Sequence, residues 1–307
     1  IRNFLIIKKL IVRLHSAKLE LCHDNGGKMK KVIFILLIIF VLSMINLLAQ
    51  NYALNFDGVN EYAKVNADAS LNMGYSSFTI EAWVKSSQSH TSEVIIVEYG
   101  TWEEGNYQLS SSYHNKMKVN FYGRSSANGA EATVDWTDGE WHHFAGVLDN
   151  ASNKIRLYMD GTLIAEDSEY NAPDNVTLPL YIAARGGTEK FSDMQIDEVC
   201  IWGDARTQSE IQDNIDSELT GSESNLVAYY KMNEGSGTSL SDNSSNSNNG
   251  TLYNMDNNNW INRDILSGYE YNPTNSPSSY DYGSNTYNEN GWTDINVNET
   301  YAIANVV

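Results

Sequence analysis

The stretch FTIEAWVK at residues 78–85 decides the fold of this chain. Every second residue from Phe78 to Val84 is apolar, which is the two-residue period of a β-strand. The stretch WHHFAGVL at residues 141–148 has the same period. Both stretches also carry apolar side chains on the opposite face, which is typical of sheets covered on both sides. They predict strands in a layered β protein.

Asp-Gly pairs separate many of the short apolar stretches. Asp160-Gly161 follows the candidate strand at residues 154–159 and is a strong hairpin signal, since both central residues of a type I′ turn need positive φ. Thr207, followed three residues later by Glu210, predicts the start of one short helix. Many short strands with regular turns predict an all-β chain, an antiparallel two-sheet β-sandwich (jelly roll) with one short helix.

A leader precedes this region. Residues 29–49 combine a basic start at Met29, an apolar run and a small residue, Ala49, at the cleavage position, and they predict a secretory signal peptide. Residues 1–28 contain no Met and are interpreted as translated upstream sequence. We therefore expect a secreted or cell-surface protein with no membrane span after cleavage. The alternative is an uncleaved N-terminal anchor.

The β pattern extends over residues 50–261 and then fades. Residues 262–307 are rich in Asn, Ser and Tyr, and Pro273 and Pro277 interrupt any strand. This last segment is interpreted as a linker that leads into the start of a truncated further module.

The net charge argues against nucleic acid as a partner. The whole chain has a formal charge of −19. Setting aside the eight basic and two acidic residues of positions 1–49 leaves twelve basic and thirty-seven acidic residues, a net charge of −25. Such a body repels nucleic acid and anionic lipid and is compatible with divalent cations and neutral glycans. Solubility alone is the simpler explanation of this charge.

Seven strings along the chain together resemble one domain family. They are ALNFDGVNEY (53–62), FTIEAWVK (78–85), GEWHH (139–143), LYMDG (157–161), IDEVCIW (196–202), TQSEI (207–211) and LVAYYKMNEG (226–235). In this order they resemble the laminin-G-like (concanavalin A-like, pentraxin-like) jelly-roll domains of secreted bacterial proteins. The resemblance implies the fold far more than the function, because one fold hosts many functions.

Two residue-level expectations come from this resemblance. Related jelly rolls often tie the turn after the first strand to a late strand with one structural calcium ion, which takes six to eight oxygen ligands. Carried over by position, the ligands are Asp57, the backbone carbonyl of Gly58, Asn60 and Asp197. The alternative is an Asp-Gly turn plus an Asp that caps backbone amides. The family usually has Arg at the position of Cys200, so an ion pair of that Arg is expected to be absent.

Glycan binding would use exposed aromatic rings beside polar groups. The loop aromatics are Trp102, Tyr107, Tyr113, Tyr122 and Trp136, and the candidate donors are His114, Arg124 and Arg185. The alternative for each ring is packing in the core or at a sheet edge.

No catalytic constellation is expected. A retaining glycosidase needs two carboxylates about 5–5.5 Å apart on one strand face. The candidate acids are Glu103-Glu104, Glu166 to Glu169 and Asp197-Glu198. None has the spacing of laminarinase-like enzymes, and neighbouring acids on a strand point to opposite faces. His142 and His143 diverge in the same way, so packing is expected for them. Cys22 precedes the predicted mature start, which leaves Cys200 as a buried, unpaired thiol.

The sequence thus predicts a secreted or cell-surface, non-catalytic module that binds carbohydrate or an extracellular protein. The alternatives are an accessory domain of a larger secreted hydrolase or protease, and a structural spacer in an adhesin. The ligand, the binding face and the oligomeric state stay open.

Overall fold

The computed structural model of this protein describes residues 51–74, 76–101, 105–111, 116–121, 129–168, 175 and 177–263. The chain divides into two compact units, residues 1–265 and 266–307, and all described residues belong to the first. The upstream segment, the signal peptide and the linker beyond residue 263 lie outside the described residues and stay predictions. Within the described ranges, no helix is long and apolar enough to cross a bilayer.

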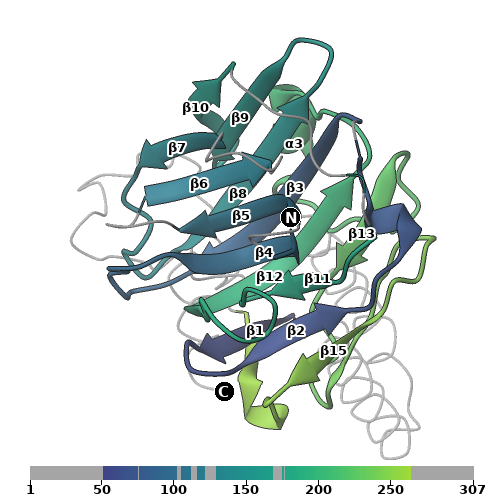
Figure 1. Cartoon of the computed structure of the whole chain (residues 1–307). Helices are drawn as coiled ribbons and strands as arrows, with labels where there is room; N and C mark the ends of the chain where they lie inside the picture. Colours follow the sequence, from purple (N-terminus) through teal and green to yellow (C-terminus); the bar gives the residue numbers. More distant parts are fainter. Residues whose placement is uncertain are drawn as a thin grey trace, which may run out of the picture. The chain divides into compact units, whose positions relative to one another are not determined.

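Two antiparallel sheets of eight strands each pack face to face as the layers of a sandwich (Figure 1). Sheet A has the strand order β10 (Thr162–Asp167), β9 (Lys154–Met159), β8 (Trp141–Asp149), β3 (Phe78–Lys85), β12 (Asp193–Trp202), β1 (Tyr52–Asp57) and β16 (Trp260–Asn262), and β13 (Leu226–Tyr230) pairs with β12. Sheet B has the order β14 (Ser239–Leu240), β15 (Gly250–Tyr253), β2 (Tyr62–Val65), β11 (Leu180–Ile182), β4 (Val94–Gly100), β5 (Gly105–Ser111), β6 (Lys116–Phe121) and β7 (Gly129–Thr133). The described helices are one α-helix, α3 (Gln208–Asn214), and the short 3-10 helices η1 (Ala69–Leu71) and η3 (Asn257–Asn259). The predicted all-β sandwich with one short helix is confirmed.

β3 confirms the strand predicted at residues 78–85 and lies between β8 and β12 in sheet A. Phe78, Ile80, Ala82 and Val84 have no exposed surface and belong to the core between the sheets. The alternate side chains of β3 lie on the outer face of sheet A, because successive residues of a strand point to opposite faces.

The β9–β10 hairpin confirms the turn signal in the sequence. Asp160 and Gly161 have φ values of 49° and 71°, as a type I′ turn requires. The pairing of the two strands shifts between Leu163 and Ala165, where a bulge interrupts the ladder.

α3 covers part of the outer face of sheet A. Thr207 and Glu210 form the predicted capping box, in which each side chain bonds to the backbone N–H of the other. Ile211 is the buried residue of the helix, and its partners on β8 and β9 are Ala145, Val147 and Tyr158. This contact explains why β8 is apolar on both faces.

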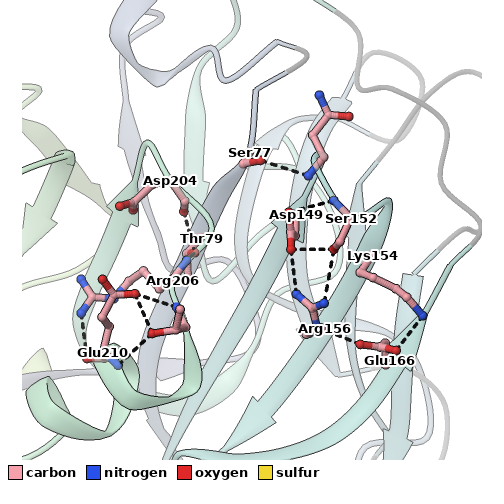
Figure 2. Close-up of polar contacts among 12 residues, drawn as sticks. Ser77, Thr79, Asp149, Ser152, Lys154, Arg156, Glu166, Asp204, Arg206 and Glu210 are labelled. Atoms are coloured by element: carbon pink, nitrogen blue, oxygen red, sulfur yellow. Dashed lines mark hydrogen bonds and ion pairs between the residues drawn. The ribbon is translucent and has the colours of Figure 1, made fainter.

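The segment before α3 is fixed to β3 by the polar network on the left of Figure 2. The Thr79 hydroxyl donates to the carbonyl of Asp204 at 2.8 Å and accepts from the N–H of Arg206 at 3.0 Å. The Arg206 guanidinium lies 3.3 Å from the carboxylate of Glu81. Glu81 is the direct cross-strand partner of the buried Cys200. Arg206 therefore places a positive charge beside Glu81, which Cys200 opposite it cannot supply.

A second network crosses β8, β9 and β10 (Figure 2). Arg156 binds Asp149 at 3.1 Å and Glu166 at 2.8 Å, and Lys154 binds Glu166 at 2.7 Å. These pairs lie at the surface of the sheet, where solvent screening leaves each only a small contribution to stability. Glu166, a candidate acid from the sequence, is engaged by two cations.

Asp242 organises the loop between β14 and β15. Its carboxylate accepts hydrogen bonds from the backbone N–H of Tyr229 (2.9 Å), Ser244 (2.8 Å) and Asn248 (2.7 Å). The side chain is only 7% exposed, so water cannot replace these bonds. This carboxylate therefore anchors the β14–β15 loop to Tyr229 of β13, beside further hydrogen bonds from Ser244 and Asn246 to the carbonyl of Val227.

We predict that Asp242→Ala lowers the free energy of unfolding by about 3 kcal/mol or more, because three buried amides lose their acceptor. Urea denaturation of the full chain measures the change. Asp256→Ala is the control, since Asp256 also accepts from backbone amides but caps the exposed helix η3. A loss of about 1 kcal/mol is expected there. Equal losses of unfolding free energy in the two variants would contradict the role of Asp242 in holding the β14–β15 loop.

Candidate functional site

Five of the predicted ligand contacts lie outside the described residues. They are Trp102, Tyr113, His114, Tyr122 and Arg124. Their role stays a prediction.

Tyr107 and Trp136 are inside the core. Neither has exposed surface. The Tyr107 ring stacks on Tyr99 with centroids 5.0 Å apart, and its hydroxyl donates to the carbonyl of Leu71 at 3.2 Å. Trp136 stacks on His90 with centroids 5.4 Å apart. The expectation that these two rings are exposed in loops is wrong, because both fill space between the sheets.

Arg185 is also buried, at 6% exposure, and is not available as a donor to a ligand. Its Nε lies 3.0 Å from Glu98 and its Nη1 lies 3.1 Å from Glu93. Burial raises the pKa of Glu98 to about 7, while the charge of Arg185 acts in the opposite direction. The arginine neutralises buried acids on sheet B, so the expectation of a ligand-binding Arg185 is wrong for this structure.

The turn at residues 57–60, predicted to bind calcium, is held by hydrogen bonds between its own residues. Oδ1 of Asp57 accepts from the N–H of Val59 at 2.8 Å and from that of Asn60 at 3.4 Å. Gly58 has a φ of 71°, and a Cβ there would lie 2.9 Å from the Cβ of Asp193. This is the geometry of an Asp-Gly turn.

Asp197 lies far from that turn. Asp57 is directly opposite Asp193 in the β1–β12 ladder. Asp197 is four residues further along β12, about 13 Å away, whereas calcium binds oxygen at about 2.3–2.6 Å. In the part of the chain that the structure describes, no three His, Cys, Asp or Glu side chains are grouped to hold a metal. The four predicted ligands do not fit one calcium ion, and the expectation of a structural calcium stays a prediction.

The neighbouring acids Asp197 and Glu198 lie in a bulge, where the pairing of β12 with β3 shifts between Asp197 and Cys200. Glu198 has a φ of 51°, in the left-handed region that few non-glycine residues adopt. Its carboxylate accepts from the hydroxyl of Tyr229, and Asp197 pairs with Arg263. Both acids therefore serve the outer face of sheet A. The expectation that they diverge is wrong, because a bulge adds one residue to the strand.

The two histidines have separate structural partners, as expected. His142 lies between Asp160 (Nδ1–Oδ2 2.9 Å) and Asp138 (Nε2–Oδ1 3.2 Å). His143 is 3% exposed and lies 3.5 Å from Glu81.

Four aromatic rings gather on the outer face of sheet B: Tyr62, Tyr181, Phe191 and Tyr253. We call this cluster the tyrosine platform. Tyr62 and Tyr253 are cross-strand partners on β2 and β15, and their rings stack with centroids 4.9 Å apart and 3° between the planes. The centroid of Tyr62 lies 6.3 Å from those of Tyr181 and Phe191. Tyr62 is thus the centre of the group, in contact with each of the other three rings.

Alternation along the strands places the platform outside. Ala63 and Val65 of β2, and Leu252 of β15, belong to the core. Their neighbours Tyr62 and Tyr253 must therefore lie on the opposite face. Tyr253 is 39% exposed, whereas Tyr181 is 8% exposed.

Three connecting segments meet beside the platform. Gly187, with a φ of 72°, lies so near that a Cβ there would be 2.7 Å from the Tyr62 ring. The side chain of Asn254, next to Tyr253, donates to the carbonyl of Asn60 at 2.7 Å. The Asp57–Asn60 turn, the 183–192 loop and the end of β15 thus converge at one end of the sandwich.

The platform offers ring faces and hydroxyls. Burial raises the pKa of Tyr62 and of Tyr181, so both phenols stay neutral near pH 7 and both donate and accept hydrogen bonds. The ammonium of Lys64 lies 6.0 Å from the Tyr181 centroid. Val59, 68% exposed in the neighbouring turn, extends the apolar surface.

None of the four platform residues is among the ligand contacts predicted from the sequence. Tyr62 and Lys64 alternate with Ala63 and Val65, which is a readable strand signal over four residues. The pairing of Tyr62 with Tyr253, however, depends on a register that one sequence does not reveal.

Fold and site together define a lectin-like β-sandwich with an aromatic surface at its loop end. A family model described as the concanavalin A-like lectin/glucanases superfamily matches residues 57–212. The match covers just over half of the 307 residues, and the chain belongs to this superfamily.

Several solved structures are similar to this chain. A "putative carbohydrate binding protein" from Bacteroides ovatus is similar with a TM-score of 0.56 and 22% identity, over 70% of this chain and 60% of that one. The chain therefore spans less than two thirds of that relative. A SAP-like pentraxin from Limulus polyphemus has a TM-score of 0.43 and 11% identity, over 53% and 81% of the two chains. Mouse laminin α1 domains LG4-5 are similar with a TM-score of 0.38 and 14% identity, over 50% of this chain and 41% of that one. No curated protein matches the sequence.

His142 gives a pH prediction. Its hydrogen bond to Asp160 is the main reason that its pKa is raised. A raised pKa contributes stability that is complete below about pH 6.5 and is lost as the pH rises through the folded-state pKa. We expect the stability difference between the wild type and His142→Gln to shrink from pH 5.5 to pH 8.5 in urea titrations.

His90→Gln is the matched control, because burial lowers the pKa of His90. Its difference from the wild type is expected to grow with pH in the same range. If the stability differences of His142→Gln and His90→Gln from the wild type changed with pH in the same direction, the opposite pKa shifts of the two histidines would be contradicted.

Proposed function

We propose that this chain is a secreted or cell-surface, non-catalytic module that binds a carbohydrate on the tyrosine platform. The observation that carries the proposal is the stacked pair of Tyr62 and Tyr253, with Tyr253 39% exposed where three connecting segments meet. Tyrosine faces stack on the C–H groups of sugars, and the hydroxyls and Asn254 supply hydrogen bonds. The leader-like sequence at residues 29–49 supports export.

A neutral glycan is the favoured ligand class. Residues 50–307 carry a net charge of −25, which repels anionic sugars. Lys64 is the one cation that contacts a ring of the platform among the described residues. The name of the Bacteroides ovatus relative, "putative carbohydrate binding protein", agrees with this ligand class.

The engagement of the acidic side chains supports a non-catalytic role. Glu81 pairs with Arg206 and lies 3.5 Å from His143. Asp197 has no exposed surface and pairs with Arg263. A glycosidase needs one carboxylate free to attack or to activate water and another free to protonate the leaving group.

The test is a glycan array probed with the full chain, followed by calorimetry on any glycan that binds. We expect neutral glycans to bind, and Tyr253→Ala to weaken binding about tenfold, a loss of about 1.4 kcal/mol. Tyr253→Phe keeps the ring and is expected to bind within about threefold of the wild type.

Leu163→Ala is the control for this experiment, since Leu163 is 42% exposed on the edge strand β10. It is expected to leave affinity unchanged. Silence across the array would favour an extracellular protein as partner. Release of reducing sugar from a bound glycan would contradict the non-catalytic part of the proposal.

A further inference from the structure

Arg263 lies on the outer face of sheet A between two tryptophan rings. Its Cζ is 4.7 Å from the centroid of Trp83 and 4.6 Å from that of Trp141. Its Nη1 lies 2.5 Å from Oδ2 of Asp197, and its backbone N–H donates to the carbonyl of Asn51 at 2.8 Å. The guanidinium thus lies against two indole rings and pairs with a carboxylate.

Three adjacent strands build this place. Trp83 of β3 is the direct partner of Asp197 on β12 and of His143 on β8. Lys85, two residues after Trp83 on the same face, is opposite Trp141. The sheet register therefore fixes the positions of the two rings and the carboxylate without any contribution from Arg263.

The buried carboxylate requires a counter-charge. Asp197 has no exposed surface, and an uncompensated charge at such depth is strongly destabilising. The side chain of Arg263 is 12% exposed, so the pair is largely shielded from water. Whatever neutralises Asp197 contributes directly to folding.

The two indole rings and the carboxylate of this site favour a guanidinium group over other cations. Guanidinium stacks flat on aromatic rings and donates from its edge to a carboxylate. Calcium requires six to eight oxygen ligands, and indole faces provide none. Ammonium has no plane to stack between two rings.

We propose that Trp83, Trp141 and Asp197 form a guanidinium-binding site, filled in this chain by Arg263. The site takes the place of a metal as the link between the end of the domain and β12. Its ligand class is the planar guanidinium cation, on an arginine side chain or free in solution.

The pH dependence gives a second readout. Burial raises the pKa of Asp197, and the charge of Arg263 opposes that rise. With Arg263 removed, the charge that opposes this rise is lost, so the pKa of Asp197 rises further. Arg263→Ala is therefore expected to lose more stability at pH 8 than at pH 5.

The main test is rescue of Arg263→Ala in the full chain. Its Tm is expected to fall by about 10 °C. Methylguanidinium at tens of millimolar is expected to recover about half of that fall, whereas calcium chloride and methylammonium recover none. Each additive is also measured with the wild type, and its effect there is subtracted.

Arg156→Ala is the matched control, because Arg156 pairs with acids at the surface of β9 without a tryptophan. Methylguanidinium is expected to leave its Tm unchanged. Arg263→Lys keeps the charge without the plane and is expected to stay less stable than the wild type.

Recovery of Arg263→Ala by calcium would overturn the proposal in favour of a metal site. Recovery by no additive would overturn it as well. If the variant does not fold unaided, its refolding yield is measured with methylguanidinium, with calcium and with neither. Folding only with methylguanidinium supports the proposal, and any other pattern contradicts it.

Discussion

The pairing of β12 (Asp193–Trp202) is the constraint on which the rest of the structure depends. Its first half lies between β1 and β3, and after the bulge at Glu198 it lies between β13 and β3. The start of the strand holds the Gly58 turn through Asp193, its middle presents Asp197 to Arg263, and its end at Trp202 leads toward α3. One strand thus positions the loop end, the buried ion pair and the helix.

The two outer faces of the described sandwich have different chemistry. On sheet A, α3 covers Ala145 and Val147, and Arg263 covers the tryptophan pair. On sheet B, the tyrosine platform ends in an exposed ring at Tyr253. α3 and Arg263 thus cover part of the outer face of sheet A, whereas the outer face of sheet B exposes the ring of Tyr253. This difference is why the binding proposal belongs to sheet B.

Local patterns predicted the fold well. The period of two at residues 78–85, the Asp160-Gly161 hairpin and the Thr207 capping box depend on residues close in sequence, and all three are confirmed. The family resemblance is confirmed by the family match over residues 57–212.

The candidate site was much less predictable, because it depends on contacts between distant residues. Arg263 and Asp197 are 66 residues apart, and the stacking of Tyr62 on Tyr253 requires the β2–β15 register. The bulge at Glu198 could not be predicted either, because no glycine marks the residue with positive φ. Tyrosine is common both at binding surfaces and in cores, so the residue type of Tyr107 does not predict its burial. The packing of the two sheets places it in the core.

A crystal structure of the full chain grown with millimolar calcium tests most directly the claim that the counter-ion of Asp197 belongs to the protein. The account predicts the Arg263 guanidinium between Trp83 and Trp141, in contact with Asp197, and no metal at that carboxylate. A calcium ion bound to Asp197, with the guanidinium displaced from both rings, would contradict it.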